Sequence, residues 1–214
     1  MQKLLRMAFF VSTLLLSFSS LAKADTVALT SVTGGNLATS GSDQLYGWIF
    51  TVNAPLTVTS LGVFDVGGDG LAISHDVGIF NETTEALLGS TTVPAGTGGT
   101  LIDGFRFESV SPFSLIQGDS YVIVMTMPNG NTDFQNIEVT SETTASQITY
   151  VNSAFGVSST LAFPTDNGAF APGLFGPNFT FASTAVTPEP ASIVLLGTGV
   201  LSVAGFARRR FLRG

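Results

Sequence analysis

The stretch LYGWIFTV, residues 45–52, decides the fold class of this chain. Every second position in it holds a large apolar side chain, namely Tyr46, Trp48, Phe50 and Val52. Successive side chains of a strand point to opposite faces, so this period of two predicts a β-strand whose aromatic face turns inward. Residues 121–127, YVIVMTM, are apolar on both faces and predict a central strand.

Strand-like segments continue along the chain at residues 77–80, 87–93, 104–110, 113–116 and 178–181, separated by turns rich in Gly, Pro, Asp and Asn. A change of phase in residues 56–63 predicts a bulge near Thr59 and Ser60. Only residues 145–155 suggest a helix, and a short one. We therefore expect an all-β fold, an antiparallel β-sandwich of jelly-roll-like type.

The N-terminus reads as a secretory signal peptide over residues 1–24. Lys3 and Arg6 precede an apolar core, and Ala22 and Ala24 form a small-x-small cleavage site. The implied partners are the Sec translocon and signal peptidase. Because Lys23 lies inside the site, an uncleaved anchor is the alternative, and it leads to the same exported location.

The C-terminus combines three unlike elements: the motif Pro188, Glu189 and Pro190, an uncharged apolar run at residues 191–207, and the cluster Arg208, Arg209 and Arg210. As a helix, the apolar run would span roughly 25 Å, just enough for a bilayer. We expect a single transmembrane helix there, because basic clusters stay on the cytoplasmic side and act as a stop-transfer signal. The two prolines predict an extended strip just outside the membrane.

This order of elements resembles the PEP-CTERM sorting signal of Gram-negative and related bacteria. The resemblance implies exosortase as a partner, which recognises the motif and removes the helix. It also implies transient anchoring in the inner membrane, followed by display at the cell surface or release. The expected domains are a signal peptide at residues 1–24, an exported domain at 25–187 and a sorting signal at 188–214, whose basic tail is 208–214. The alternative for this C-terminal segment is a plain single-span anchor.

Residues 61–80 are similar to an exported domain of unknown function that often accompanies such tails, and no activity comes with that likeness. The charge of residues 25–187 is more informative, since 14 acids face one base, Arg106, for a net charge of −13. Such a domain repels nucleic acid, so we expect no nucleic-acid partner. The chain has no cysteine, which leaves neither disulfides nor thiolate chemistry outside the cell.

A metal site is conceivable between two strands, where Asp65, Asp69 and Asp76 take positions 1, 5 and 12 of a calcium-loop pattern. Position 3 is Gly67, which has no side-chain oxygen. Calcium is therefore a minor expectation beside a glycine-rich turn with solvated carboxylates, and no other cofactor is expected.

The sequence contains few arrangements of residues that could support catalysis. Ser74, His75 and Asp76 are adjacent, so on a strand they point to alternate faces and do not form a triad. We expect His75 to be hydrogen-bonded to a neighbouring loop and Arg106, facing away from Phe105 and Phe107, to pair with an acid. Paired carboxylates for glycoside hydrolysis are not marked by any spacing.

The sequence thus predicts an exported, exosortase-processed protein of the cell surface or extracellular matrix, associated with exopolysaccharide and biofilm and without catalytic activity. The alternative is a surface carbohydrate-binding module. Such a module would stack a sugar on exposed aromatic side chains, for which the candidates are Tyr46, Trp48, Tyr121 and Tyr150. The alternation around Trp48 instead favours a position in the core for that side chain.

Overall fold

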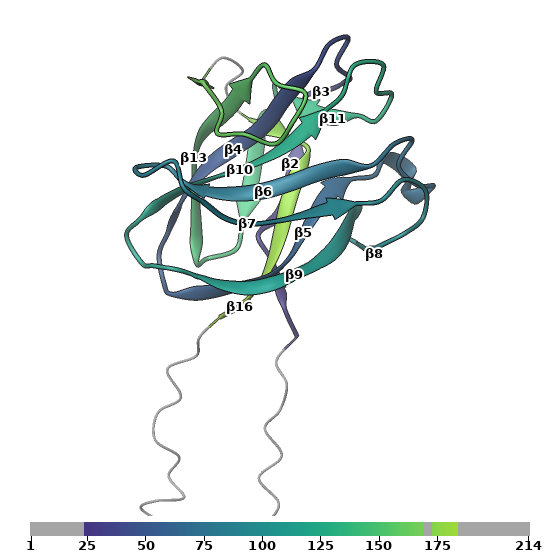
Figure 1. The fold of residues 1–214 in the computed structure, drawn as a ribbon. Helices are drawn as coiled ribbons and strands as arrows, with labels where there is room; N and C mark the ends of the chain where they lie inside the picture. The colour runs from purple at the N-terminus through teal and green to yellow at the C-terminus, as the bar shows by residue number, and fades with distance from the viewer. Residues whose placement is uncertain (1–23, 169–172, 184–214) are drawn as a thin grey trace, which may run out of the picture. The chain divides into compact units, whose positions relative to one another are not determined.

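The computed structural model describes residues 24–168 and 173–183, which form an all-β structure of antiparallel strands (Figure 1). The predicted signal peptide before residue 24, and the predicted sorting motif, membrane helix and arginine cluster after residue 183, lie outside the described residues. The chain divides into two units, Met1–Ser183 and Thr184–Gly214. Within the described ranges, no helix has the length and apolar character needed to cross a bilayer.

A six-stranded sheet is built around the stretch that opened the sequence analysis. Its order is β14-β13-β4-β10-β6-β7, with β14 (Asp166–Asn167), β13 (Ile148–Gly156), β4 (Gln44–Val52), β10 (Ser120–Met127), β6 (His75–Asn81) and β7 (Leu87–Val93). β10 is central, as its two apolar faces predicted. The segment expected as a helix at residues 145–155 is instead mostly strand β13, because its side chains pack beside β4 in the core.

A five-stranded sheet faces it. Its order is β1-β16-β5-β9-β8, with β1 (Thr26–Val27), β16 (Pro177–Ser183), β5 (Leu56–Phe64), β9 (Phe105–Leu115) and β8 (Thr100–Ile102). The register of β5 with β9 shifts between Val58 and Ser60, which confirms the predicted bulge. A 3-10 turn η1 (Val66–Gly68) follows β5.

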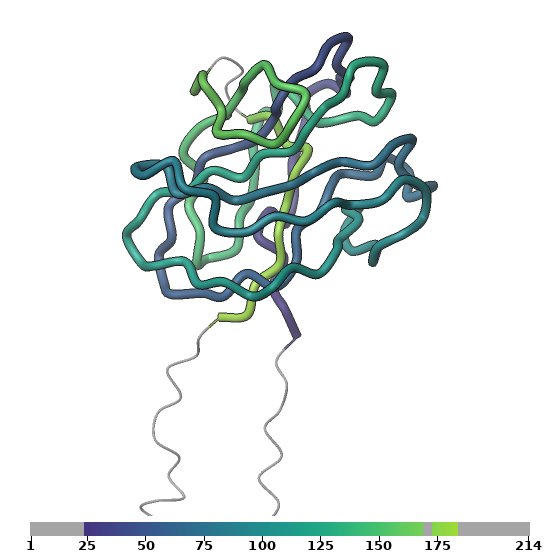
Figure 2. Tube along the Cα trace, viewed as in Figure 1, coloured from purple at the N-terminus to yellow at the C-terminus, as the bar shows by residue number. Residues whose placement is uncertain are grey.

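Two small sheets complete the fold. One has the order β15-β11-β3, and the other pairs β12 with β2; their strands are β15 (Leu174–Phe175), β11 (Gln135–Ile137), β3 (Asn36–Ala38), β12 (Ser141–Thr144) and β2 (Leu29–Thr33). Figure 1 and Figure 2 show β3 and β11 at one end of the larger sheets.

The core lies between the two large sheets and is rich in aromatic rings. Trp48 of β4 stacks on Phe179 of β16, with ring centroids 6.0 Å apart, and Phe50 lies 5.0 Å from the same ring. Trp48, Phe50 and Phe179 are fully buried, and the Nε1 of Trp48 donates a 2.8 Å hydrogen bond to the carbonyl of Pro177. The inward aromatic face predicted for residues 45–52 is therefore confirmed.

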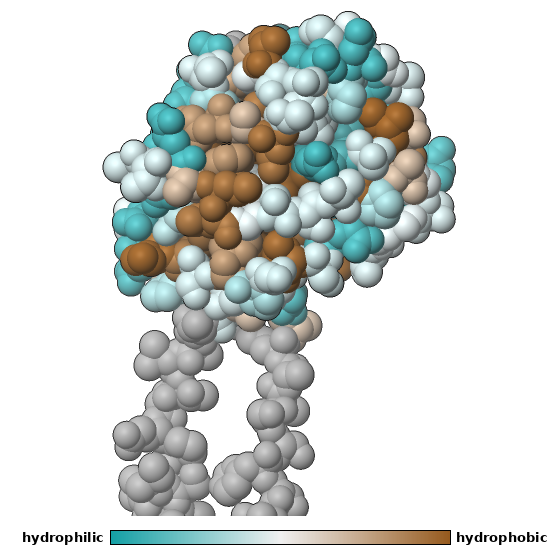
Figure 3. Space-filling model, viewed as in Figure 1, coloured by the Kyte–Doolittle hydropathy of each residue, from teal (hydrophilic) through white to brown (hydrophobic). Residues whose placement is uncertain are grey.

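The outer face of the six-stranded sheet is also apolar. Ile49, Phe80, Val122, Val124 and Ala154 form a second buried cluster, against which Leu161 and Phe163 pack. Figure 3 shows hydrophobic side chains gathered on the face that carries β6 and β7. Ile49 of β4 belongs to this outer cluster, whereas its neighbours Trp48 and Phe50 face the main core.

Candidate functional site

The described residues enclose a cavity of about 270 Å³ at the end of the sheets where β5 stops and β6 starts. One wall is the turn that follows β5, and the other is the loop that follows β10. The lining residues are Phe64, Asp65, Val66, Asp69, Gly70, Ala72, Thr132, Asp133 and Phe134. Three of these nine side chains are carboxylates and two are phenyl rings.

Asp65 lies at the base of the first wall and is almost completely buried. Its Oδ2 accepts a 2.6 Å hydrogen bond from Nε of Arg106, and the amide of Gly70 donates to both carboxylate oxygens at 3.2 Å. The remaining guanidinium nitrogens of Arg106 donate to the carbonyls of Thr97 and Gly68, at 3.1 and 2.9 Å. One buried cation on β9 thus connects the turn after β5 to the loop that contains Thr97.

The strand register explains why Arg106 is inside. Residues paired across antiparallel strands point to the same side of the sheet. Arg106 pairs with Val63, which lies in the core, whereas Phe105 and Phe107 pair with Phe64 and Gly62 and so point to the other side of the sheet. The expectation that Arg106 faces away from its flanking phenylalanines and pairs with an acid is confirmed, and all three side chains are buried.

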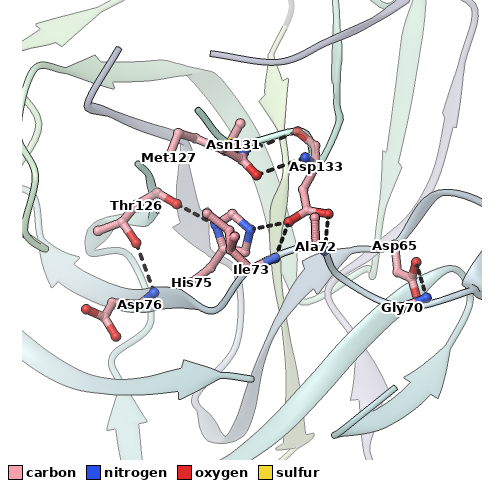
Figure 4. A network of polar contacts seen from close by, with 10 residues as sticks. All are labelled: Asp65, Gly70, Ala72, Ile73, His75, Asp76, Thr126, Met127, Asn131 and Asp133. Carbon is pink, nitrogen blue, oxygen red and sulfur yellow. Dashed lines mark hydrogen bonds and ion pairs between the residues drawn. The ribbon is translucent and has the colours of Figure 1, made fainter. Parts of the chain in front are cut away.

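Asp133 lies in the second wall (Figure 4). Its two oxygens accept hydrogen bonds from the amides of Ala72 and Ile73, at 2.7 and 3.2 Å, and Oδ2 lies 2.9 Å from Nε2 of His75. Burial by itself raises the pKa of Asp133, but the hydrogen bonds from His75, Ala72 and Ile73 outweigh it, so the pKa lies below its ordinary value.

His75 is completely buried at the first position of β6, and both of its ring nitrogens face oxygen atoms. Nδ1 lies 2.6 Å from the carbonyl oxygen of Thr126, and Nε2 faces Asp133. A neutral imidazole donates from only one nitrogen, whereas the imidazolium form donates from both. The expected contact between His75 and a neighbouring loop is confirmed.

Of the three carboxylates predicted to bind calcium, Asp65 and Asp69 line the same cavity and Asp76 does not. Asp65 pairs with Arg106, Asp69 lies exposed at the rim, and Asp76 accepts a 2.6 Å hydrogen bond from Thr92 on β7. Figure 4 shows Asp76 on the opposite side of His75 from Asp65. Across the described ranges, no group of three or more His, Cys, Asp and Glu side chains is placed to hold a metal ion. Calcium binding stays a prediction.

Ser74, His75 and Asp76 do not form a catalytic triad. The ring nitrogens of His75 face Thr126 and Asp133 and are not hydrogen-bonded to Ser74 or Asp76.

The sugar-binding platform predicted from aromatic side chains is wrong for Trp48 and Tyr121. These residues are 0% and 2% exposed and therefore cannot stack on a ligand. Both belong to the core, as the alternation of residues 45–52 favoured.

Sequence analysis missed Asp133 and Phe134. The local signal around them was weak, since they lie in a polar loop between β10 and β11 without periodicity. Their relevance comes from a contact with a segment about 60 residues earlier in the chain, which no local pattern reveals.

Comparison with known proteins adds one result about the part of the chain beyond the described residues. No curated protein matches the sequence. Residues 186–210 match the PEP-CTERM protein-sorting motif, and this range contains Pro188, Glu189, Pro190 and the three consecutive arginines. The chain therefore carries a PEP-CTERM sorting motif at its C-terminus, which marks it as an exosortase-processed surface protein.

Proposed function

We propose that the chain is an exported structural protein of the cell surface or extracellular matrix, associated with exopolysaccharide and biofilm and without catalytic activity. In this proposal, residues 1–24 direct export and are removed by signal peptidase, and residues 191–207 hold the precursor in the inner membrane. Exosortase then acts at Pro188, Glu189 and Pro190. The observation that carries the proposal is the sorting motif at residues 186–210.

The fold supports this route because the first and last described strands, β1 and β16, lie at the same end of the domain; we call their outer ends, Thr26 and Ser183, the attachment points. Thr26 pairs with Phe181 and Val27 with Thr180, so the first and last described strands lie side by side in one sheet. Only four residues separate Ser183 from Pro188. A fully extended chain of that length reaches at most about 17 Å. Exosortase therefore has to act close to the β1–β16 end of the domain.

The proposal of a non-catalytic role is supported by how the reactive side chains are used. The single histidine has both nitrogens engaged, and the carboxylates of Asp65 and Asp133 are engaged by the side chains of Arg106 and His75 and by backbone amides. A general base needs a free position within reach of a substrate proton. His75 is completely buried and offers none.

The processing step can be tested by replacing Pro188, Glu189 and Pro190 with alanine in the full chain. We expect the full-length precursor to accumulate in membranes, whereas the parent protein and the surface variant Val157→Ala are processed. Immunoblots of membrane and culture fractions would measure this. Mature protein of unchanged size outside cells that make the triple variant would refute processing at the motif.

The second candidate function is a surface carbohydrate-binding module, and one observation favours it: the cavity joins two phenyl rings to fixed carboxylates. A glycan array probed with the mature protein from culture tests it. Because Trp48 is buried, substitution at that residue is not a useful control for sugar stacking.

Calcium binding is kept as a third proposal for Asp65, Asp69 and Asp76. If calcium binds there, millimolar calcium should raise the melting temperature of the protein, and Asp69→Ala should abolish the rise. An unmoved transition in the parent protein would remove the proposal.

A further inference from the structure

We propose that the cavity between residues 65–72 and 132–134 binds one sugar unit of a polysaccharide, as a neutral ligand rich in hydroxyl groups. This inference rests on the carbohydrate-binding alternative of the proposed function and gives that alternative a site. Four features of the cavity support it: its size, its fixed acceptors, its charge and its aromatic walls.

The cavity has room for one six-membered ring. Its volume of about 270 Å³ lies just below the range of pockets that hold drug-sized ligands, which begins at about 300 Å³. A single ring fits such a volume, while the rest of a polysaccharide chain would continue outside it. The site thus suits a terminal or protruding sugar unit.

Two of the three carboxylates, Asp65 and Asp133, are acceptors held in fixed positions. A carboxylate has about four lone-pair sites. Asp133 uses three of them for Ala72, Ile73 and His75, and Asp65 uses its oxygens for Arg106 and Gly70. Asp69 has no hydrogen bond in the described structure that engages its carboxylate and lies exposed at the rim. Fixed acceptors favour binding because little side-chain freedom is lost when a donor arrives.

The local charge favours hydroxyl donors over a metal ion. Arg106 lies against Asp65, so one of the three acidic side chains already has a cationic partner, and Asp133 is engaged by Nε2 of His75 at 2.9 Å. These are the only arginine and the only histidine in residues 25–187. The guanidinium of Arg106 would repel a divalent cation, whereas a neutral hydroxyl group would still find acceptor lone pairs.

The phenyl rings supply the apolar part of the site. Phe134 is 40% exposed at the mouth of the cavity, and Phe64 forms part of its wall in contact with Phe105. The faces of aromatic rings carry negative charge density and attract the positively polarised C–H groups of a sugar ring. An exposed phenylalanine beside fixed carboxylates therefore suits a sugar, which presents both apolar C–H groups and hydroxyl groups.

The site is presented at the end of the domain away from the attachment points. Leu56 at the start of β5 pairs with Ser183, and β5 runs from there to Phe64 beside the cavity. A strand of this length spans about 26 Å. While the precursor is anchored by its C-terminal segment, the cavity lies at the opposite end of β5 from Ser183.

The experiment measures binding of the mature protein to an array of neutral hexoses, deoxysugars, uronic acids and amino sugars, followed by calorimetric titration of the best sugar. We expect Phe134→Ala and Asp69→Asn each to weaken that binding by about tenfold or more. Two matched controls, Ile116→Ala and Glu85→Gln, change an exposed side chain of the same kind at the other end of the sheets and should bind as the parent does.

Three results would overturn the proposal, and they have different consequences. Binding that survives both cavity variants places the sugar elsewhere and leaves the carbohydrate-binding function standing. Binding to no sugar on the array removes the site and that function together. Binding that requires calcium and is lost in EDTA replaces the sugar site with a cation site. Unchanged melting temperatures of Phe134→Ala and Asp69→Asn exclude misfolding as the cause of any loss.

Discussion

Asp65 and Arg106 form a 2.6 Å ion pair in which the side chains are 1% and 5% exposed. The pair joins the turn after β5 to strand β9, and Arg106 also binds the carbonyls of Thr97 and Gly68. Removing two charges from water is costly, and hydrogen bonds to every available partner offset that cost. The pair therefore fixes the shape of the cavity more than it stabilises the fold.

Replacing Arg106 with methionine should destabilise the protein by about 3–5 kcal/mol, because it leaves the carboxylate of Asp65 buried without a partner. The double variant Arg106→Met/Asp65→Leu should recover most of that loss, since it removes both charges. Urea unfolding followed by fluorescence of the single tryptophan would measure both. Equal stability of parent and Arg106→Met would contradict the importance of the pair.

Acid should weaken the contact between Asp133 and His75. The folded-state pKa of Asp133 lies below its ordinary value of 3.8, despite the opposing effect of burial, because of the hydrogen bonds that it accepts. Its contribution to stability is therefore present above about pH 4 and is lost as pH falls through the lower folded-state value.

The Asp133→Asn variant should be less stable than the parent at neutral pH and should lose less stability below pH 4. Asp69→Asn changes the net charge equally and serves as the control. Melting temperatures of the parent and both variants between pH 2 and 7 would measure this difference in acid sensitivity. Parallel curves for parent and Asp133→Asn would show that this contact does not contribute to acid sensitivity.

Alkaline titration should reveal one tyrosine that ionises very late. Burial, together with the charge of Glu142, raises the pKa of Tyr150 to about 12, and the backbone of Gly173 opposes the shift. The neutral side chain therefore contributes stability that is fully present below pH 10 and is lost as the pH rises towards 12. Tyrosinate absorbance should lack this last step in Tyr150→Phe and retain it in Tyr121→Phe.

Trp48 should be the most costly residue to truncate. It is fully buried, contacts Phe50, Phe175 and Phe179, and donates a hydrogen bond to Pro177. Trp48→Ala should lose about 3–5 kcal/mol, and Trp48→Phe should lose less because a ring remains. Thermal unfolding would measure the difference, with Val157→Ala, at a 74% exposed position, expected within about 0.5 kcal/mol of the parent.

Much of the fold could be predicted locally. The alternation in residues 45–52, the apolar run of β10 and the bulge after Val58 were all readable, because a strand side chain repeats every two residues. Strand β13 was misread as a short helix. Its bulge between Tyr150 and Asn152 interrupts the alternation, and only pairing with β4 reveals the strand.

The candidate site was predicted only in part. The sequence indicated that Asp65 and Asp69 lie in a glycine-rich turn, and that Arg106 needs an acidic partner. It did not indicate Asp133 or Phe134, because the loop that carries them reaches the cavity through contacts of Asp133 with residues 72, 73 and 75, far away along the chain. Asp76 was grouped with Asp65 by spacing alone, but it lies on strand β6, where it accepts a hydrogen bond from Thr92 of β7.

The sequence by itself determined that the chain is acidic, all-β and marked for sorting, since charge, side-chain period and a linear motif are each local properties. Tertiary structure decided which of 14 acids matter at a site. Three of them line one cavity, and two of these, Asp65 and Asp133, are held in place by the buried side chains of Arg106 and His75. Such a placement depends on the pairing of distant strands, and long-range pairing leaves no trace in local sequence.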